Sequence, residues 1–155
     1  MDNSEKASRG QDLAAAEGKP VPKPTPRGKL ATRTLAMPGD ANPSGDIFGG
    51  WVLSQMDIAG GITAGQRAQG RVATVAVTAM TFHLPVYVGD VLCVYADIEK
   101  VGRSSITIHI EAWALRGRLG QRVRVTEGQF VFVAIDAEGR PRGVPPEQPA
   151  EAVEV

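Results

Sequence analysis

The sequence is poor in the residues that form covalent crosslinks and metal centres. It contains one cysteine, Cys93, and two histidines, His83 and His109, in 155 residues. A lone cysteine can form neither an internal disulfide nor a thiolate cage, and two histidines do not make up a metal-ligand cluster. We therefore expect no metal site and no cofactor held by the chain.

Charge of one sign and long apolar runs are also missing. Seventeen basic residues balance seventeen acidic ones, so the formal net charge is zero, whereas nucleic-acid binders neutralise phosphates with Lys and Arg. No apolar stretch approaches the ~20 residues of a membrane span, and the N-terminus lacks the apolar core of a signal peptide. The composition predicts a cytoplasmic protein whose partners include neither nucleic acid nor a membrane.

Both ends of the chain are rich in proline, unlike the middle. The stretch KPVPKPTPRGK has four prolines between Pro20 and Pro26, and GVPPEQPAEAVEV at the other end has three. Such segments bury too little apolar surface to offset the entropy lost on ordering. We expect disordered tails over residues 1–28 and 144–155, on either side of one folded domain over residues 29–143.

Within this domain the hydrophobic pattern predicts one helix and five strands. Apolar side chains recur at spacings of three and four from residue 49 to about 69, which favours a helix; they are Trp51, Val52, Met56, Ala59 and Ile62. Runs rich in β-branched residues at 30–37, 72–82, 91–100, 104–115 and 121–135 predict strands, the last with a bulge at Glu127–Gly128. This order predicts an α+β fold, with an antiparallel sheet and the helix on its apolar face.

The helix contains residues that are unfavourable in an ordinary helix. Gly60, Gly61 and Gly65 each cost about 1 kcal/mol relative to alanine, so we expect the sheet to approach the helix backbone and to bury nearly its whole circumference. Asp57 is the only charged residue between Asp46 and Arg67. Because a buried carboxylate is costly unless it is paired, Asp57 is either a structural hydrogen-bonding group or a catalytic one.

Several motifs resemble a known family. The run NPSGDIFGGWVLSQMD (42–57), followed by MTF (80–82), PVYVGDVL (85–92) and KVGRSS (100–105), resembles the hotdog-fold acyl-CoA thioesterases, in particular the short bacterial YciA-like group. The resemblance implies an antiparallel sheet wrapped around one long central helix. In that family a Gly-Gly pair opens the helix and an acid follows, here Gly49–Gly50 and Asp57. Many relatives carry histidine before the glycines, where this chain has Phe48.

The resemblance also implies an activity, the hydrolysis of acyl-CoA to free coenzyme A and a carboxylic acid. Coenzyme A is then part of the substrate and no separate cofactor is needed. Asp57 would act as general base or nucleophile, and the N–H of Gly50, next to Gly49 at the positive end of the helix, would stabilise the oxyanion. Asn42 and Asp46 would position water or shape the pocket, although the same residue types also make ordinary turns.

Further residues would contact the substrate. By resemblance, Phe48, Thr81 and Phe82 would line the acyl or pantetheine channel, although a core position also suits the last two. The KVGRSS turn would lie near the phosphates of coenzyme A, whose oxygens suit Arg and Ser donors; a solvated hairpin would have the same composition. The residues of this turn are Lys100, Gly102, Arg103, Ser104 and Ser105.

Helix geometry calls for a second subunit. Asp57 lies seven positions after Gly50, roughly 10 Å along the helix axis, whereas one thioester must lie within about 3 Å of both groups. Two helices packed antiparallel around a two-fold axis can supply the two groups. We therefore expect a homodimer with composite active sites and, by resemblance, a trimer of dimers. Two alternatives on the same fold are a non-catalytic acyl-CoA sensor and a hydratase or dehydratase, which would need a histidine that this helix lacks.

Overall fold

The computed structural model describes residues 23–149 and shows one α-helix with five strands. The elements follow in the order β1 (Lys29–Leu35), η1 (Pro38–Asp40), α1 (Gly49–Ala68), β2 (Val72–Phe82), β3 (Val91–Val101), β4 (Ser105–Arg116) and β5 (Gln121–Ala134). The predicted helix and the five predicted strands are confirmed, with bounds that shift by no more than two residues. No helix among the described residues combines the length and apolar character that a membrane span requires.

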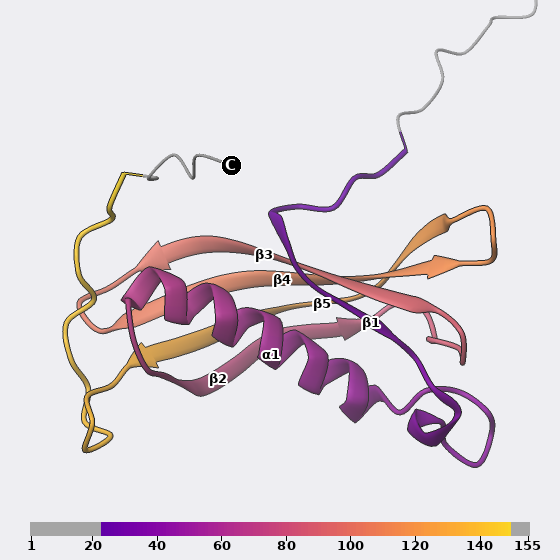
Figure 1. Cartoon of the computed structure of the whole chain (residues 1–155), viewed down its shortest axis with the longest axis horizontal. Coiled ribbons are helices and arrows are strands. Elements are labelled where there is room, and N and C mark those ends of the chain that lie inside the picture. Colours follow the sequence, from indigo (N-terminus) through magenta and orange to yellow (C-terminus); the bar gives the residue numbers. More distant parts are fainter. Residues whose placement is uncertain (1–22, 150–155) are drawn as a thin grey trace, which may run out of the picture.

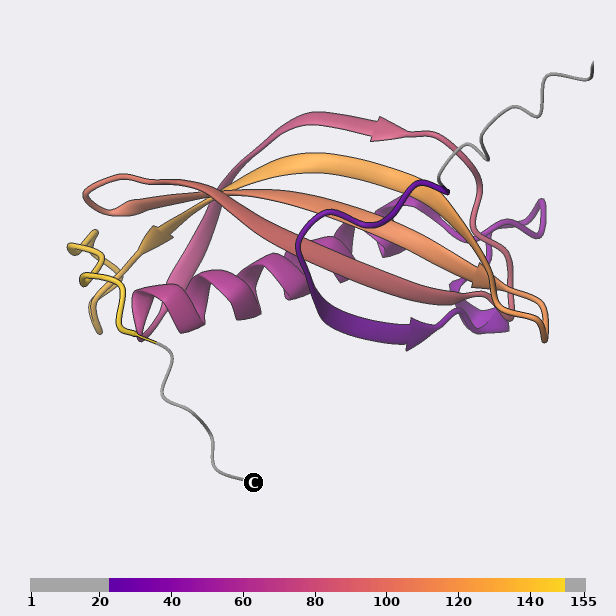
Figure 2. The same ribbon diagram turned by 90° about the horizontal axis from the view of Figure 1, so that it is seen from above.

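The strands form a single antiparallel sheet in the order β1-β3-β4-β5-β2. The two edges of this sheet are therefore β1 and β2, and β2 follows α1 directly in the chain. The helix lies across one face of the curved sheet (Figures 1 and 2). This arrangement confirms the predicted α+β class and the hotdog architecture.

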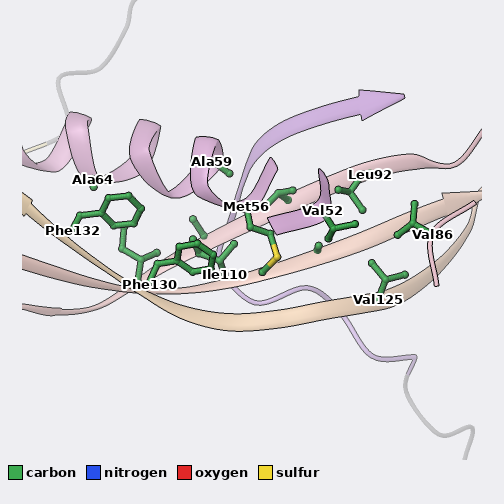
Figure 3. Close-up of a cluster of buried hydrophobic side chains, with 14 of the residues drawn as sticks. Val52, Met56, Ala59, Ala64, Val86, Leu92, Ile110, Val125, Phe130 and Phe132 are labelled. Atoms are coloured by element: carbon green, nitrogen blue, oxygen red, sulfur yellow. The ribbon is translucent and has the colours of Figure 1, made fainter. Parts of the chain in front are cut away.

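The hydrophobic core lies between α1 and the sheet. Figure 3 shows Phe130 and Phe132 of β5 and Ile110 of β4 packed below Met56 and Ala59 of the helix. The two phenyl rings are stacked, with their centroids 6.3 Å apart. All five side chains are buried, so this layer fixes the position of the helix on the sheet.

One helix glycine is required by this packing. A Cβ on Gly60 would lie 2.6 Å from Ile110 Cδ1 and 2.7 Å from Phe132 Cζ, which are closer than real contacts. By contrast, a Cβ on Gly61 or Gly65 would meet its nearest neighbours at 4.0 and 3.5 Å. The predicted close approach is therefore confirmed at Gly60 and wrong for the other two glycines.

The prediction that the helix is buried around nearly its whole circumference is wrong for the single chain. Ile58 is 50% exposed and Ile62 is 44% exposed, so Ile62 does not belong to the core face to which its spacing assigned it. The physical reason is that the sheet covers α1 from one side. The buried residues of α1 form one row along that side; they are Val52, Met56, Ala59, Gly60, Ala64 and Ala68.

The bulge expected at Glu127–Gly128 is displaced. The register of β5 against β4 shifts at Val125 instead. Opposite Gly128 the extra residue belongs to β2, where Ala79 takes a φ of 50°. A Cβ on Gly128 would lie 3.0 Å from Met80 Sδ, so this glycine makes room for the irregularity of the neighbouring strand.

Contacts extend beyond both ends of the predicted domain. Arg27 Nε lies 2.6 Å from Asp97 Oδ2, and the Arg27 amide donates to Glu111 Oε2 at 3.1 Å. At the other end, Arg67 Nη1 donates to the carbonyl of Pro145 at 2.6 Å. Ordered contacts thus begin before residue 29 and continue past residue 143. The parts of the predicted tails at 1–22 and 150–155 lie outside the described residues.

Candidate active site at the start of the helix

The loop before α1 is closed by its own polar side chains. Asn42 Oδ1 accepts hydrogen bonds from the amides of Ser44 at 2.9 Å and Asp46 at 3.2 Å. The amide of Ile47 then donates to the carbonyl of Val86 at 2.9 Å. Asn42 and Asp46 therefore make the turn that their residue types allow, and this turn anchors the chain just before the helix begins.

The first turn of α1 offers two free backbone donors. Gly49 and Gly50 are its first residues, and neither amide has an acceptor within residues 23–149. Such orphan N–H groups carry the positive end of the helix dipole. A Cβ on Gly49 would lie 3.4 Å from the ring of Phe82, whereas a Cβ on Gly50 would meet nothing within 4 Å. The backbone at Gly50 is thus open to a ligand.

A cavity of about 250 Å³ opens beside these glycines. Its walls are Ile47, Gly49 and Val52, the segment 82–86 at the end of β2, and Thr126 of β5. The lining is largely apolar and adjoins the free N–H groups. A chemical group held by those donors can therefore extend an apolar tail into the cavity.

Only one of the three residues predicted to line a substrate channel lies in the wall of this cavity. Phe82 forms part of the cavity wall, whereas Thr81 does not. Phe48 is the residue just before α1 and is half exposed. A larger cavity of about 510 Å³ lies between β1, β3 and the C-terminal half of α1, and it includes none of the predicted site residues.

Asp57 lies two turns along the helix and is partly buried. Thr74 Oγ1 of β2 donates to Asp57 Oδ1 at 2.6 Å, while Asp57 Oδ2 has no donor in the described part of the chain. The sequence did not single out Thr74. Because β2 follows α1 directly in the chain, we expect one of its side chains to lie near Asp57. The sequence pattern of the strand does not predict which side chain that is.

The two candidate catalytic groups remain apart in a single chain. The helix is continuous from Gly49 to Ala68, so the expected rise of roughly 10 Å between Gly50 and Asp57 holds. One carbonyl group cannot lie within hydrogen-bonding distance of both. Within one chain, Gly50 and Asp57 therefore cannot act on the same carbonyl group.

The turn predicted to bind phosphates lies near the opposite end of the helix. Figures 1 and 2 show the β3–β4 turn close to the C-terminal end of α1. Lys100 and Arg103 are exposed there. The amide of Gly102 donates to the Ser105 carbonyl at 2.8 Å, and the Ser104 carbonyl accepts a hydrogen bond from the end of β5 at 2.8 Å. Backbone hydrogen bonds thus close the hairpin, and its two cationic side chains have no acidic partner within residues 23–149.

A second polar group lies on the sheet face away from the helix. Glu111 is buried there; Trp113 Nε1 donates to it at 2.8 Å, and His109 Nε2 lies 3.1 Å from it. Burial raises the pKa of the Glu111 carboxyl, but hydrogen bonds from Trp113, the Arg27 amide and His109 outweigh burial and hold the pKa below its usual value. This carboxylate ties the segment before β1 to the sheet.

Oxygen and nitrogen atoms of His109, Glu111 and Glu127 lie within 4.8 Å of one another. Arg124 Nη1 lies 3.0 Å from Glu127 and 3.8 Å from Glu111. A guanidinium group therefore already supplies positive charge to these carboxylates. The cluster is accounted for as a structural network of hydrogen bonds and ion pairs.

Comparison with known proteins gives consistent matches. The sequence model of the thioesterase superfamily matches residues 44–121. The acyl-CoA thioester hydrolase YciA of Salmonella typhimurium is 54% identical over 124 residues, which cover 78% of this chain and 93% of the relative.

Two solved structures extend the likeness to the fold. The hexameric thioesterase from Yersinia pestis is 58% identical, with a TM-score of 0.76 over 79% of this chain and 100% of that chain. A hexameric broad-specificity acyl-coenzyme A thioesterase, solved as an aspartate-to-alanine mutant, is 52% identical, with a TM-score of 0.76 over 78% of this chain and 89% of that chain. The chain therefore belongs to the thioesterase superfamily and, within it, to the YciA-like acyl-CoA thioester hydrolases.

Proposed function

We propose that the chain hydrolyses acyl-CoA to free coenzyme A and a carboxylic acid at a site built by two subunits. The observation that carries this proposal is that, within residues 23–149, the N–H groups of Gly49 and Gly50 have no acceptor and one carboxylate oxygen of Asp57 has no donor. Acyl transfer needs both kinds of group, a donor for the developing oxyanion and a base or nucleophile. The activities named for the similar enzymes support the substrate class.

The chemistry follows from these groups. The thioester carbonyl accepts a hydrogen bond from Gly50 N–H, which strengthens as the oxygen becomes an oxyanion. Asp57 either takes a proton from the attacking water or attacks the carbonyl carbon itself. Thr74 holds one carboxylate oxygen and leaves the other for this role. Collapse of the intermediate breaks the C–S bond, and coenzyme A leaves as a thiolate that takes up a proton. If water is the attacking group, the carboxylic acid forms in this step. If Asp57 attacks, an acyl-aspartyl anhydride remains, and water hydrolyses it to the carboxylic acid and free Asp57.

A two-fold dimer would complete the site. β2 is an edge strand, and its exposed side chains include Val75 and Val77. Antiparallel pairing of β2 with the same strand of a second copy would continue the sheet and lay the two helices side by side. Gly50 of one chain would then lie beside Asp57 of the other. The hexamers formed by similar enzymes support a trimer of such dimers.

The same arrangement gives the β3–β4 turn a role. Within one chain this turn and the start of α1 lie at opposite ends (Figure 1). An antiparallel partner reverses that relation, so the turn of one chain approaches the Gly49–Gly50 donors of the other. Lys100 and Arg103 would then bind the phosphates of coenzyme A. In this proposal the chain that supplies Asp57 also supplies the phosphate-binding turn.

The direct test is thiol release from a panel of acyl-CoA esters. We expect the purified protein to release free coenzyme A without added metal or nucleotide. The panel should vary chain length and include a matched acyl-pantetheine thioester, which lacks the phosphates. Binding of acyl-CoA without any thiol release would contradict hydrolysis and indicate an acyl-CoA-binding protein on the same fold.

A further inference from the structure

One residue in the wall of the cavity beside Gly49 carries a buried polar atom that the proposed chemistry does not use. Thr126 is 1% exposed, and its Oγ1 has no hydrogen-bond partner in the described part of the chain. It follows the bulged residue Val125 on β5 and lines the cavity. Val125 is turned toward the core as well, so the bulge places two consecutive side chains on the helix side of the sheet.

A buried hydroxyl without a partner is unusual, because most buried polar side-chain atoms in proteins are satisfied. Leaving one unpaired is destabilising, whereas an apolar side chain of the same shape avoids the loss. The side-chain oxygen of Thr32 is also buried and has no hydrogen-bond partner among residues 23–149, but Thr32 does not line this cavity. Thr126 therefore combines an unmet hydrogen bond with a position at a ligand-sized space.

The cavity restricts what can meet this hydroxyl. Its other walls are apolar apart from His83, which lies 3.5 Å from Glu127 and so has a partner of its own. A volume of about 250 Å³ has room for roughly eight water-sized groups at about 30 Å³ each. That is the size of a short acyl chain rather than of the nucleotide end of coenzyme A. In the proposed chemistry the N–H groups of Gly49 and Gly50 hold the thioester carbonyl at the mouth, so the acyl chain is the part that would enter.

We propose that Thr126 Oγ1 forms a hydrogen bond with an oxygen atom on the acyl chain, and that the site thereby favours short hydroxyacyl-CoA esters over their alkyl counterparts. The inference rests on the proposed function and deepens it. An alkyl chain leaves the hydroxyl unpaired, while a chain oxygen satisfies it. Because Oγ1 is buried in the unliganded chain, the proposal requires rotation about χ1 to another staggered position, which turns the hydroxyl toward an oxygen that enters the cavity.

The test compares two variants and three substrates. Thr126→Val keeps the shape and removes the hydroxyl, and Thr126→Ser keeps the hydroxyl. Butyryl-CoA is the alkyl substrate, and 2-hydroxybutyryl-CoA and 3-hydroxybutyryl-CoA place an oxygen at two depths. For each hydroxyacyl ester, kcat/KM is divided by kcat/KM for butyryl-CoA, and the larger of the two ratios is the readout. This ratio should fall by about fivefold to a hundredfold in Thr126→Val, the range for a buried hydroxyl left unpaired. It should stay nearer the wild-type value in Thr126→Ser.

A purely structural role for Thr126 would change folding and leave the ratio alone. Thr126→Val should melt no lower than the wild type, because a methyl group replaces an unpaired hydroxyl. An unchanged ratio in Thr126→Val would overturn the proposal. An equal fall in both variants would also overturn it, because Thr126→Ser keeps the hydroxyl and should therefore keep the preference.

Binding separates this inference from the proposed function. In an Asp57→Ala background, calorimetry with the same three esters measures affinity without turnover, and adding Thr126→Val should reduce the preference for the hydroxyacyl ester. A wild type that releases no thiol from any ester would defeat the proposed function while this binding preference could still stand. Active enzyme with no such preference at either step would defeat the inference alone.

Discussion

The two faces of α1 differ in their contacts within one chain: the inner face packs against the sheet, and the outer face leaves large apolar side chains exposed. On the inner face, Met56 is fully buried and Gly60 leaves room for Ile110 and Phe132. On the outer face, Ile58 is half exposed, and the glycines at 61 and 65 make no contact that a Cβ would disturb. Each of those glycines costs about 1 kcal/mol relative to alanine. Folding thus accounts for the residues of the inner face, whereas the residues of the outer face are explained by the subunit contact and the chemistry that we propose.

Substitutions at two adjacent residues on different faces of α1 should separate the loss of turnover from the loss of folding stability. Asp57→Asn should lower turnover by at least about a hundredfold, the scale of a lost general base, with little change in melting temperature. Met56→Ala should lower the free energy of unfolding by about 2–5 kcal/mol through a cavity in the core. Thiol release and thermal unfolding measure the two effects. An Asp57→Asn protein with near-normal turnover would remove Asp57 from the mechanism.

A second pair tests the two kinds of helix glycine. Gly60→Ala should destabilise folding by about 1–3 kcal/mol, because its Cβ would overlap the ends of Ile110 and Phe132. Gly61→Ala is the matched control, since its Cβ would lie 4.0 Å from Phe132, and it should be no less stable than the wild type as a folded chain. Denaturant unfolding of both variants checks this. Equal losses in the two would show that close packing is not what separates them.

A third comparison concerns the two hairpin turns. If the β3–β4 turn binds phosphates, replacing Lys100 and Arg103 by alanine should raise KM for acyl-CoA several-fold more than KM for an acyl-pantetheine thioester. A tenfold difference would correspond to about 1.4 kcal/mol of binding free energy. The effect should shrink at high salt because exposed charges are screened. Arg118→Ala, in the exposed turn between β4 and β5, is the control. A loss shared equally by both substrates would indicate a role in folding.

The smallest effect is expected on the far face of the sheet. The pKa of Glu111 is lowered in the folded chain, so its ionised form adds stability above the unfolded pKa of about 4.3. That stability is lost as the pH falls through the folded pKa. Glu111→Gln should be less stable at neutral pH and should lose less stability on acidification. Glu138 is an exposed carboxylate, so the stability of Glu138→Gln should depend on pH as that of the wild type does. The same pH dependence in Glu111→Gln would contradict the lowered pKa of Glu111.

The sequence predicted those features that depend on period and motif. Alternating and helical patterns located the strands and α1, and the run from Asn42 to Asp57 located the glycines and the acid. Residues whose role depends on distant partners were missed. Thr74 and Thr126 lie in strands whose pattern is the same with or without a polar role, and Arg27 meets residues some seventy positions away. The bulge in β5 lies at Val125 and not at the predicted Glu127–Gly128. Its position depends on how the strands pair, and no local sequence pattern predicts that pairing.

In the proposed dimer, each active site takes groups from two chains. A mixture of two inactive variants tests this arrangement. Asp57→Ala removes the base, and Gly50→Pro removes an N–H at a place where proline suits the first helical turn and where added atoms meet nothing within 4 Å of the Cβ. In purified heterodimers of the two, a shared arrangement leaves one site with both groups and the other with neither. We expect about half of wild-type turnover per dimer, given two-fold symmetry. Heterodimers that are folded yet as inactive as their parents would contradict it.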